Sequence, residues 1–260
     1  MSQSLDRALT MLTELAGGPR TLDQLAGTLG VHKSTALRLL RTLESHRFVQ
    51  RDDVRHYRLG TAMFDLANQA LEERDVRRLV EPHLRALNAR TGHTVHLASY
   101  EDGEVVYIDK YDSRHPVRMY SRIGRRAALH CTAVAKVLVA ALPAAERRAI
   151  AASIDYPRLT ANTITDSQGY LDELERVREQ GYAVDNAEHE DFIHCLGAPI
   201  RGAGGRVVAA VSLSVPQMLL DFDGLMELLP DLVRTAEAAS VECGWTPTPG
   251  RVPGTTRKDD

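Results

Sequence analysis

The sequence predicts two domains of different fold class, a small and mostly helical unit followed by a larger α+β unit. Three observations support this prediction. The chain has 260 residues, which is long enough for two separate cores. Apolar residues recur at the helical period over the first 45 residues, whereas residues 81–245 mix strand and helix patterns without regular βαβ alternation. A further helical segment, residues 61–80, separates the two patterns.

Two short amphipathic helices are predicted at the start of the chain. Apolar residues recur at helical spacing from Leu5 to Ala16, and the segment Gly17 to Pro19 ends this helix. Thr21 and Gln24 have the spacing of a capping box, so we expect the second helix to begin there. Gly30 ends it, because glycine readily adopts the left-handed conformation that closes a helix.

A third helix is predicted over about residues 32–45, with two unlike faces. Its apolar residues share one side, and Arg38 and Arg41 lie on the opposite, polar side. Two short helices joined by a glycine turn, the second with a basic outer face, form the helix-turn-helix pattern. Residues 48–51 and 56–59 then predict a hairpin around Asp52-Asp53, which would serve as a wing.

Charge is distributed unevenly between the two halves. The whole chain has a net charge of −3, which alone would disfavour a nucleic-acid partner. Residues 1–60 hold nine lysines and arginines against six acidic residues, a net charge of +3, so the other 200 residues carry −6. A basic third helix and hairpin on an acidic remainder favours DNA binding. The alternative is a helical module that serves only for dimerisation.

The sequence also indicates a compartment. Charged residues interrupt the apolar pattern of the first 18 residues, which excludes a secretory signal peptide. The longest uncharged apolar stretch, Val207 to Leu220, is too short to span a bilayer. Three cysteines, odd in number and far apart, do not resemble a disulfide framework. We therefore expect a cytoplasmic protein with no membrane partner.

The second domain is predicted to combine two antiparallel hairpins with helices. The turn Gly202 to Gly205 is not followed by a helix signal, so we expect a hairpin turn rather than a phosphate-binding loop. The predicted strands are residues 94–98, 104–109, 117–121, 193–200 and 207–214, and the predicted helices are residues 132–142 and 166–181. The tail, residues 246–260, is rich in proline and glycine, and we expect it to be disordered.

Several motifs are specific enough to suggest a family. Residues 33–44 read KSTALRLLRTLE, and residues 122–143 read RIGRRAALHCTAVAKVLVAALP. Together with residues 181–200 and 207–216, they resemble the IclR family of bacterial transcriptional regulators over about residues 4–240. The resemblance implies a winged helix-turn-helix and, over residues 81–245, a GAF/PAS-like α+β domain with a small-molecule pocket, joined by a linker helix.

The resemblance also implies a function. It predicts a regulator, expected to be a repressor, that binds operator DNA and responds to a small organic acid, with no cofactor, metal or catalytic site. Arg38 is the best candidate for a base contact, because a guanidinium can pair bidentately with guanine. The residues expected to contact DNA are Lys33, Ser34, Thr35, Arg38 and Arg41, with Arg51, Arg55 and Arg58 on or beside the wing.

Motif position places the effector pocket. Backbone N–H groups at a helix start suit a carboxylate, and Ser212 and Ser214 lie on one face of a strand where both can donate to one ligand. The alternative is that these serines face solvent. The residues that the resemblance assigns to the effector are Ala133, Val134, Asp185, Cys195, Ser212 and Ser214.

Two positions depart from the family pattern. Ala135 stands where the family has a glycine before the lysine, which restricts how closely a ligand can approach that backbone. Arg47 stands where a glycine is usual near the end of the recognition helix, and it adds a candidate phosphate contact.

Histidines and cysteines suggest two other kinds of site. His130, Cys131, Asp185, His189, His194 and Cys195 include zinc-ligand types, but their spacing is not that of a compact finger. Cys195 could act as a catalytic thiol, yet no nucleophile signature surrounds it. These ideas belong to the alternative function, a metabolite-binding or enzymatic α+β protein whose N-terminal helices serve only for dimerisation.

The segment between the domains predicts assembly. An apolar stripe recurs at helical spacing over residues 63–71, and Pro82 is expected to mark the start of the next element. Such a stripe requires a partner, so we expect a homodimer or homotetramer that presents paired recognition helices. The alternative is that the stripe packs against the chain's own second domain. The stripe consists of Met63, Leu66, Ala67, Ala70 and Leu71.

Overall fold

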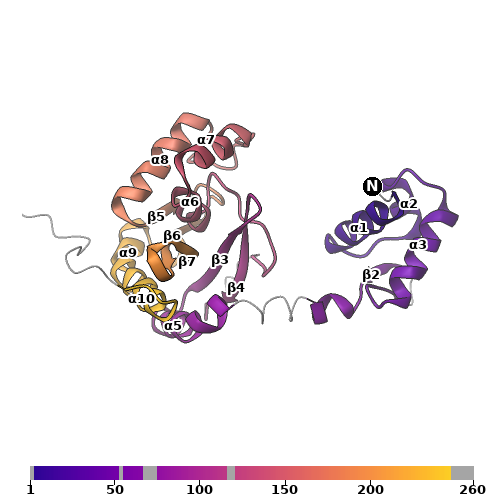
Figure 1. Ribbon diagram of the computed structural model, residues 1–260, viewed down its shortest axis with the longest axis horizontal. Coiled ribbons are helices and arrows are strands. Elements are labelled where there is room, and N and C mark those ends of the chain that lie inside the picture. Colours follow the sequence, from indigo (N-terminus) through magenta and orange to yellow (C-terminus); the bar gives the residue numbers. More distant parts are fainter. Residues whose placement is uncertain (1–2, 53–54, 67–74, 116–120, 247–260) are drawn as a thin grey trace, which may run out of the picture. The chain divides into compact units, whose positions relative to one another are not determined.

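The computed structural model describes residues 3–52, 55–66, 75–115 and 121–246. Contacts divide the chain into two compact units, residues 1–74 and 75–260 (Figure 1). Parts of four predicted elements lie outside the described residues: residue 53 of the wing turn, residues 67–74 of the linker, 117–120 of one strand and 247–260 of the tail. Within the described ranges, no helix is long and apolar enough to cross a membrane.

The N-terminal unit has three helices followed by a two-stranded antiparallel hairpin, as the sequence predicts. Its elements are α1 (Gln3–Ala16), α2 (Leu22–Thr28), α3 (Lys33–Ser45), β1 (Val49–Arg51) and β2 (Tyr57–Leu59). The capping box is present, because the Thr21 side chain accepts a hydrogen bond from the Gln24 N–H and the Gln24 side chain accepts one from the Thr21 N–H. Gly30 has a φ of +60°, as its predicted helix-ending role requires.

One apolar core joins these elements. Met11, Leu25 and Leu40 come from three different helices and are almost completely buried, and Val49 and Tyr57 close the core from the hairpin. Each such side chain stabilises the fold by about 1.5–3 kcal/mol through burial. The core therefore fixes the inner face of α3 and leaves its polar face outward.

The C-terminal unit is built on a five-stranded antiparallel sheet with the order β4-β3-β7-β6-β5. The strands are β3 (Thr94–Glu101), β4 (Glu104–Tyr111), β5 (Ala183–Asn186), β6 (Ile193–Arg201) and β7 (Val207–Pro216). The helices are α5 (Asp75–Thr91), α6 (Ala133–Ala140), α7 (Ala144–Ser153), α8 (Ser167–Gln180), α9 (Phe222–Glu227) and α10 (Leu229–Glu242). The short turn Ala203–Gly205 joins β6 to β7, as predicted.

Helices cover both faces of this sheet (Figure 1). Helix α6 packs on β3, β6 and β7 from one side, with α7 and α8 behind it, and α5 and α10 pack on the other side. Successive side chains of β7 point to opposite faces of the sheet. Val211 and Leu213 belong to the core under α5 and α10, whereas Ser212 and Ser214 lie on the α6 side.

Helix α5 crosses the boundary that the sequence places between residues 80 and 81. The expectation that Pro82 marks the start of a new element is wrong, because Pro82 lies inside this helix. Proline has no N–H to donate to the carbonyl of Arg78, which normally breaks a helix. Val80, Leu84 and Leu87 are fully buried in the core shared with α10, and this burial maintains the helix through the proline.

Candidate DNA-binding face and ligand pocket

The residues predicted to contact DNA lie on α3 and on the hairpin of the N-terminal unit, and most of them are exposed. On α3, Lys33, Ser34, Arg38 and Arg41 are exposed and Thr35 is half-buried. Three arginines of the hairpin region are also exposed, namely Arg51, Arg55 and Arg58. The structure therefore leaves most of these side chains accessible.

Several of these residues already have partners, among them Arg51, whose guanidinium lies 5.7 Å from the centroid of the Tyr57 ring. The Lys33 ammonium lies 2.9 Å from a carboxylate oxygen of Asp23, and both side chains are largely exposed. His32 caps α3 by accepting a hydrogen bond from the Ser34 N–H. A surface ion pair contributes about 0–1 kcal/mol, so a phosphate can replace Asp23 at little cost. Arg38 and Arg41 have no ion pair within the described part of the chain.

A cavity of about 50 Å³ lies between the N-terminus of α6 and the sheet. All six residues that the sequence assigns to the effector line this cavity. Its other lining residues include His96, Tyr107, Ser121, Arg125 and Arg126, which were not predicted. A cavity of this size holds a few water molecules.

Strand register explains why distant segments of the chain meet here. Asp185 on β5 pairs with Cys195 on β6, and Cys195 pairs with Ser214 on β7. Ser212 pairs with His96 on β3. Directly opposed residues on neighbouring strands project from the same face, so these five side chains form one continuous polar surface under α6.

The two serines of β7 are buried rather than facing solvent. Ser212 and Ser214 are 3% and 2% exposed, and each hydroxyl lies 3.4 Å from Nδ1 of His96. The other ring nitrogen of His96 is 2.6 Å from the Ser121 hydroxyl. Burial, assisted by the charge of Lys110, lowers the pKa of His96 to about 3. The imidazole is therefore neutral and offers one donor and one acceptor.

The start of α6 presents unsatisfied amides to the cavity. The first N–H groups of a helix have no intrahelical acceptor, and no side chain caps those of α6. The Thr132 hydroxyl donates instead to the Ala128 carbonyl. Ala135, which replaces the family's glycine, is fully buried within α6 and is not a lining residue, whereas Ala133 and Val134 are.

Positive charge and a raised carboxyl pKa make the cavity suitable for an anion. Arg125 and Arg126 line its exposed rim, where Arg126 also pairs with Glu104, and Glu190 is a further acidic lining residue. Burial raises the pKa of Asp185 to about 7, although its Oδ1 accepts hydrogen bonds from the N–H groups of Glu188 (2.8 Å) and His189 (3.4 Å). A carboxyl group that retains its proton near neutral pH repels an anion less than a carboxylate does.

Neither a metal centre nor a reactive thiol gains support from the geometry. Within the described ranges, no three His, Cys, Asp or Glu side chains form a metal-binding cluster. His194 contacts Phe222 and the carbonyl of Leu220 rather than the cavity. Burial raises the pKa of the Cys195 thiol well above its ordinary value, which disfavours the nucleophilic thiolate.

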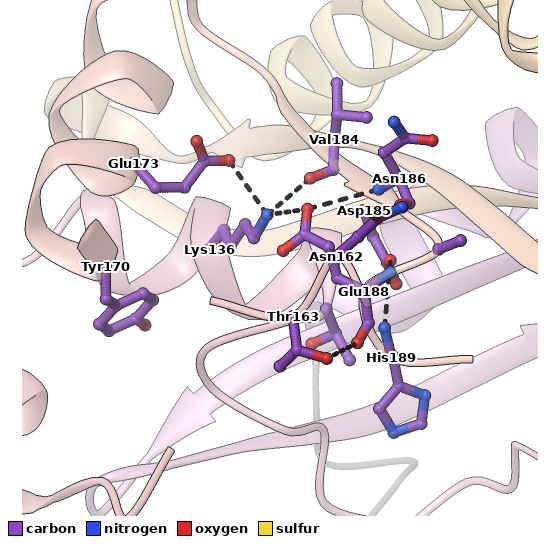
Figure 2. A network of polar contacts seen from close by, with 12 residues as sticks. Lys136, Asn162, Thr163, Tyr170, Glu173, Val184, Asp185, Asn186, Glu188 and His189 are labelled. Carbon is purple, nitrogen blue, oxygen red and sulfur yellow. Dashed lines mark hydrogen bonds and ion pairs between the residues drawn. The ribbon is translucent and has the colours of Figure 1, made fainter. Parts of the chain in front are cut away.

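A buried ion-pair network adjoins the pocket and was not predicted. Figure 2 shows the Lys136 ammonium between Glu173, Glu188 and the carbonyl of Val184. The sequence did contain a signal, because Lys136 is the one charged residue of the otherwise apolar helix α6. A charged side chain on a fully buried helix needs a buried partner.

Comparison with known proteins assigns the family. Residues 4–53 match the IclR helix-turn-helix domain, and residues 68–241 match the C-terminal domain of the bacterial transcriptional regulator IclR. The chain belongs to the IclR family. Its function is therefore that of a DNA-binding transcriptional regulator, and the family consists of regulators rather than enzymes.

Individual IclR-family members are similar over almost the whole chain. The regulator KdgR of Escherichia coli is 35% identical over 225 residues, which cover 86% of each chain. The transcriptional repressor AllR of Salmonella typhi is 32% identical over 250 residues, covering 95% of this chain and 92% of AllR. The crystal structure of Thermotoga maritima IclR, 31% identical, covers 94% of this chain and 100% of its own with a TM-score of 0.77. These similarities confirm the predicted winged helix-turn-helix and α+β fold.

Proposed function

We propose that this IclR-family protein is a homo-oligomeric repressor whose operator binding is controlled by a small carboxylate held at the N-terminus of α6. One observation carries the proposal. Residues from β5, β6, β7 and the start of α6 line one cavity, which also has uncapped helix amides and, at its exposed rim, Arg125 and Arg126. Amides at a helix N-terminus together with arginine side chains favour a carboxylate.

On the DNA side, Arg38 is proposed to read a base edge and the remaining predicted residues to contact phosphates. Arg38→Ala should weaken operator binding by about 1–3 kcal/mol and reduce discrimination against mismatched sites. Fluorescence anisotropy at two salt concentrations measures both effects. Arg148→Ala is the matched control, since Arg148 is an exposed arginine of the C-terminal unit. Unchanged affinity and specificity of the Arg38 variant would overturn its role.

On the ligand side, the test is a panel of carboxylates, glyoxylate, pyruvate, 4-hydroxybenzoate and gluconate, of which the cavity of about 50 Å³ favours the two smaller ones. A bound member should raise the unfolding temperature of the C-terminal unit, because a ligand stabilises the state that it binds. The same compound should weaken operator binding if the protein is a repressor released by its effector. Ser212→Ala combined with Ser214→Ala should remove both responses. A response that survives in this variant would place the ligand elsewhere.

Oligomer formation is proposed from exposed apolar side chains of the N-terminal unit. Leu5 and Leu9 of α1 are 60% and 56% exposed. Phe64 and Leu66, in the short helical segment after β2, are also exposed. A second copy of the chain would cover such residues and place two recognition helices about 34 Å apart or a multiple of it. Light scattering of the full chain and of Leu9→Lys tests this, with a lower mass expected for the variant.

A further inference from the structure

Lys136 binds three separate segments of the C-terminal unit. Its side chain is 1% exposed, and its ammonium lies 2.6 Å from Glu188 Oε1 and 3.0 Å from Glu173 Oε1. The ammonium also donates to the Val184 carbonyl at 2.8 Å. One side chain of α6 thus holds α8, β5 and the turn that follows β5 (Figure 2).

That turn carries part of the pocket wall. The Glu188 N–H donates to Oδ1 of Asp185 at 2.8 Å, and Asp185 and His189 both line the cavity, whereas Lys136 does not. The Thr163 hydroxyl donates to the Glu188 carbonyl at 2.7 Å and secures the other side of the turn. A chain of short contacts therefore runs from Lys136 through Glu188 to Asp185.

Lys136 supplies the positive charge that balances the buried carboxylate of Glu188. Glu173 has a second, exposed partner in Arg176 at 3.0 Å, but among the described residues Glu188 has an ion pair only with Lys136. Oε2 of Glu188 is buried and has no hydrogen-bond partner among the described residues. Without Lys136, Glu188 would be a buried carboxylate with no cation, so the turn would have to move to reach water.

We propose that Lys136 is a positioning residue of the pocket. Through Glu188 and Val184 it holds the turn after β5, and so fixes Asp185 opposite the α6 amides. The same helix supplies those amides one turn earlier, at Ala133 and Val134, so α6 determines the position of both walls. The inference rests on the proposed carboxylate pocket for its functional meaning, but the position of the turn can be measured without any ligand.

Hydrogen exchange of the full chain tests the proposal directly. In Lys136→Met, amides of residues 186–190 should exchange at least tenfold faster, while those of the β3–β4 pair keep the wild-type rate. Alkylation of Cys195 by iodoacetamide should accelerate, and that of Cys131, which does not line the cavity, should not. Unchanged exchange in the turn would overturn the proposal, as would an equal increase throughout the unit.

A double variant separates positioning from general stability. Lys136→Met with Glu188→Gln removes both charges and leaves no lone buried ion, so its unfolding temperature should lie above that of the single variant. Its turn should still exchange faster than that of the wild type, because no ammonium holds it. A double variant with wild-type exchange in the turn would show that Lys136 only balances the charge of Glu188.

Ligand titrations link the turn to function. Glyoxylate and 4-hydroxybenzoate are the probes, and any probe that binds the wild type should bind the double variant at least tenfold more weakly, with operator affinity in the absence of probe unchanged. Equal probe affinity in the two proteins would overturn the proposal. If neither probe binds the wild type, the proposed carboxylate fails for these compounds, and hydrogen exchange alone decides the role of Lys136.

Discussion

At the scale of single residues, Asp185 makes the stability of the C-terminal unit depend on pH. Its pKa is raised from 3.8 to about 7 in the folded protein, mainly by burial. The folded state therefore binds this proton more tightly than the unfolded state. The resulting stabilisation is complete below about pH 4 and is lost as the pH rises through about 7.

Asp185→Asn should consequently stabilise the C-terminal unit at high pH. Asparagine can still accept the Glu188 N–H but carries no charge, so we expect a gain of about 1–3 kcal/mol at pH 8 and little change at pH 4. Denaturant unfolding at the two pH values measures the difference. Asp155→Asn, at an exposed position, is the control. An Asp185→Asn variant that is less stable than the wild type at pH 8 would contradict the assignment.

Arg47 shows a different conflict between conformation and charge. It follows α3 with a φ of +62°, a conformation that costs non-glycine residues about 1–2 kcal/mol and that glycine would adopt freely. Arg47→Gly should therefore stabilise the N-terminal unit by about 0.5–1 kcal/mol in thermal unfolding. The same variant should bind operator DNA less tightly and with a smaller salt dependence if Arg47 contacts a phosphate. Arg47→Lys, which keeps both the charge and the strain, should change neither property.

At the scale of elements, the contact between α6 and β6 depends on one glycine. A Cβ atom on Gly197 would lie 2.9 Å from the backbone carbonyl of Ala133, so β6 and the start of α6 approach at a distance that only glycine allows. Gly197→Ala should force α6 away from the sheet, destabilise the C-terminal unit by about 1–3 kcal/mol and weaken carboxylate binding. Gly169→Ala is the control, because a Cβ there meets only ordinary contacts and alanine favours helix. Equal stability of the two variants would exclude this close approach.

The elements also show what the sequence can and cannot predict. Strong periodicity and explicit caps predicted α1 to α3, α8 and both hairpins of the second domain, since local patterns decide these elements. Strand β5 has only four residues, which is too few for alternation. Helix α5 contains Pro82, whose helix-breaking preference is overridden by tertiary burial, whereas Pro230 lies in the first turn of α10, where proline is tolerated.

The same limit applies to the pocket. Motif position identified Asp185, Cys195 and Ser214, which the structure brings into one row. His96 and the position of Arg125 at the rim depend on which strand lies beside which, and the order β4-β3-β7-β6-β5 cannot be derived from one sequence. The Lys136 network depends on helix packing as well as on strand order. From the sequence alone, only the presence of one charged residue in an otherwise apolar helix could be recognised.

At the scale of the whole molecule, the two units have separate apolar cores and opposite charge. The core of the N-terminal unit contains residues of α1 to β2 only, and those of the C-terminal unit contain residues from α5 onward. The positive charge of residues 1–60 and the negative charge of the remainder are consistent with DNA binding by the N-terminal unit and ligand binding by the C-terminal unit.

Separate cores predict two unfolding transitions in calorimetry of the full chain, because multidomain proteins commonly depart from two-state behaviour. Leu40→Ala should destabilise only the N-terminal unit by about 2–5 kcal/mol, and Leu213→Ala only the C-terminal unit by a similar amount. Operator DNA should raise the first transition and a bound carboxylate the second. Any shift that a carboxylate causes in the first transition measures the coupling between the sites, and linkage requires operator DNA to change carboxylate affinity by the same factor. A single transition lowered equally by both substitutions would contradict independent cores.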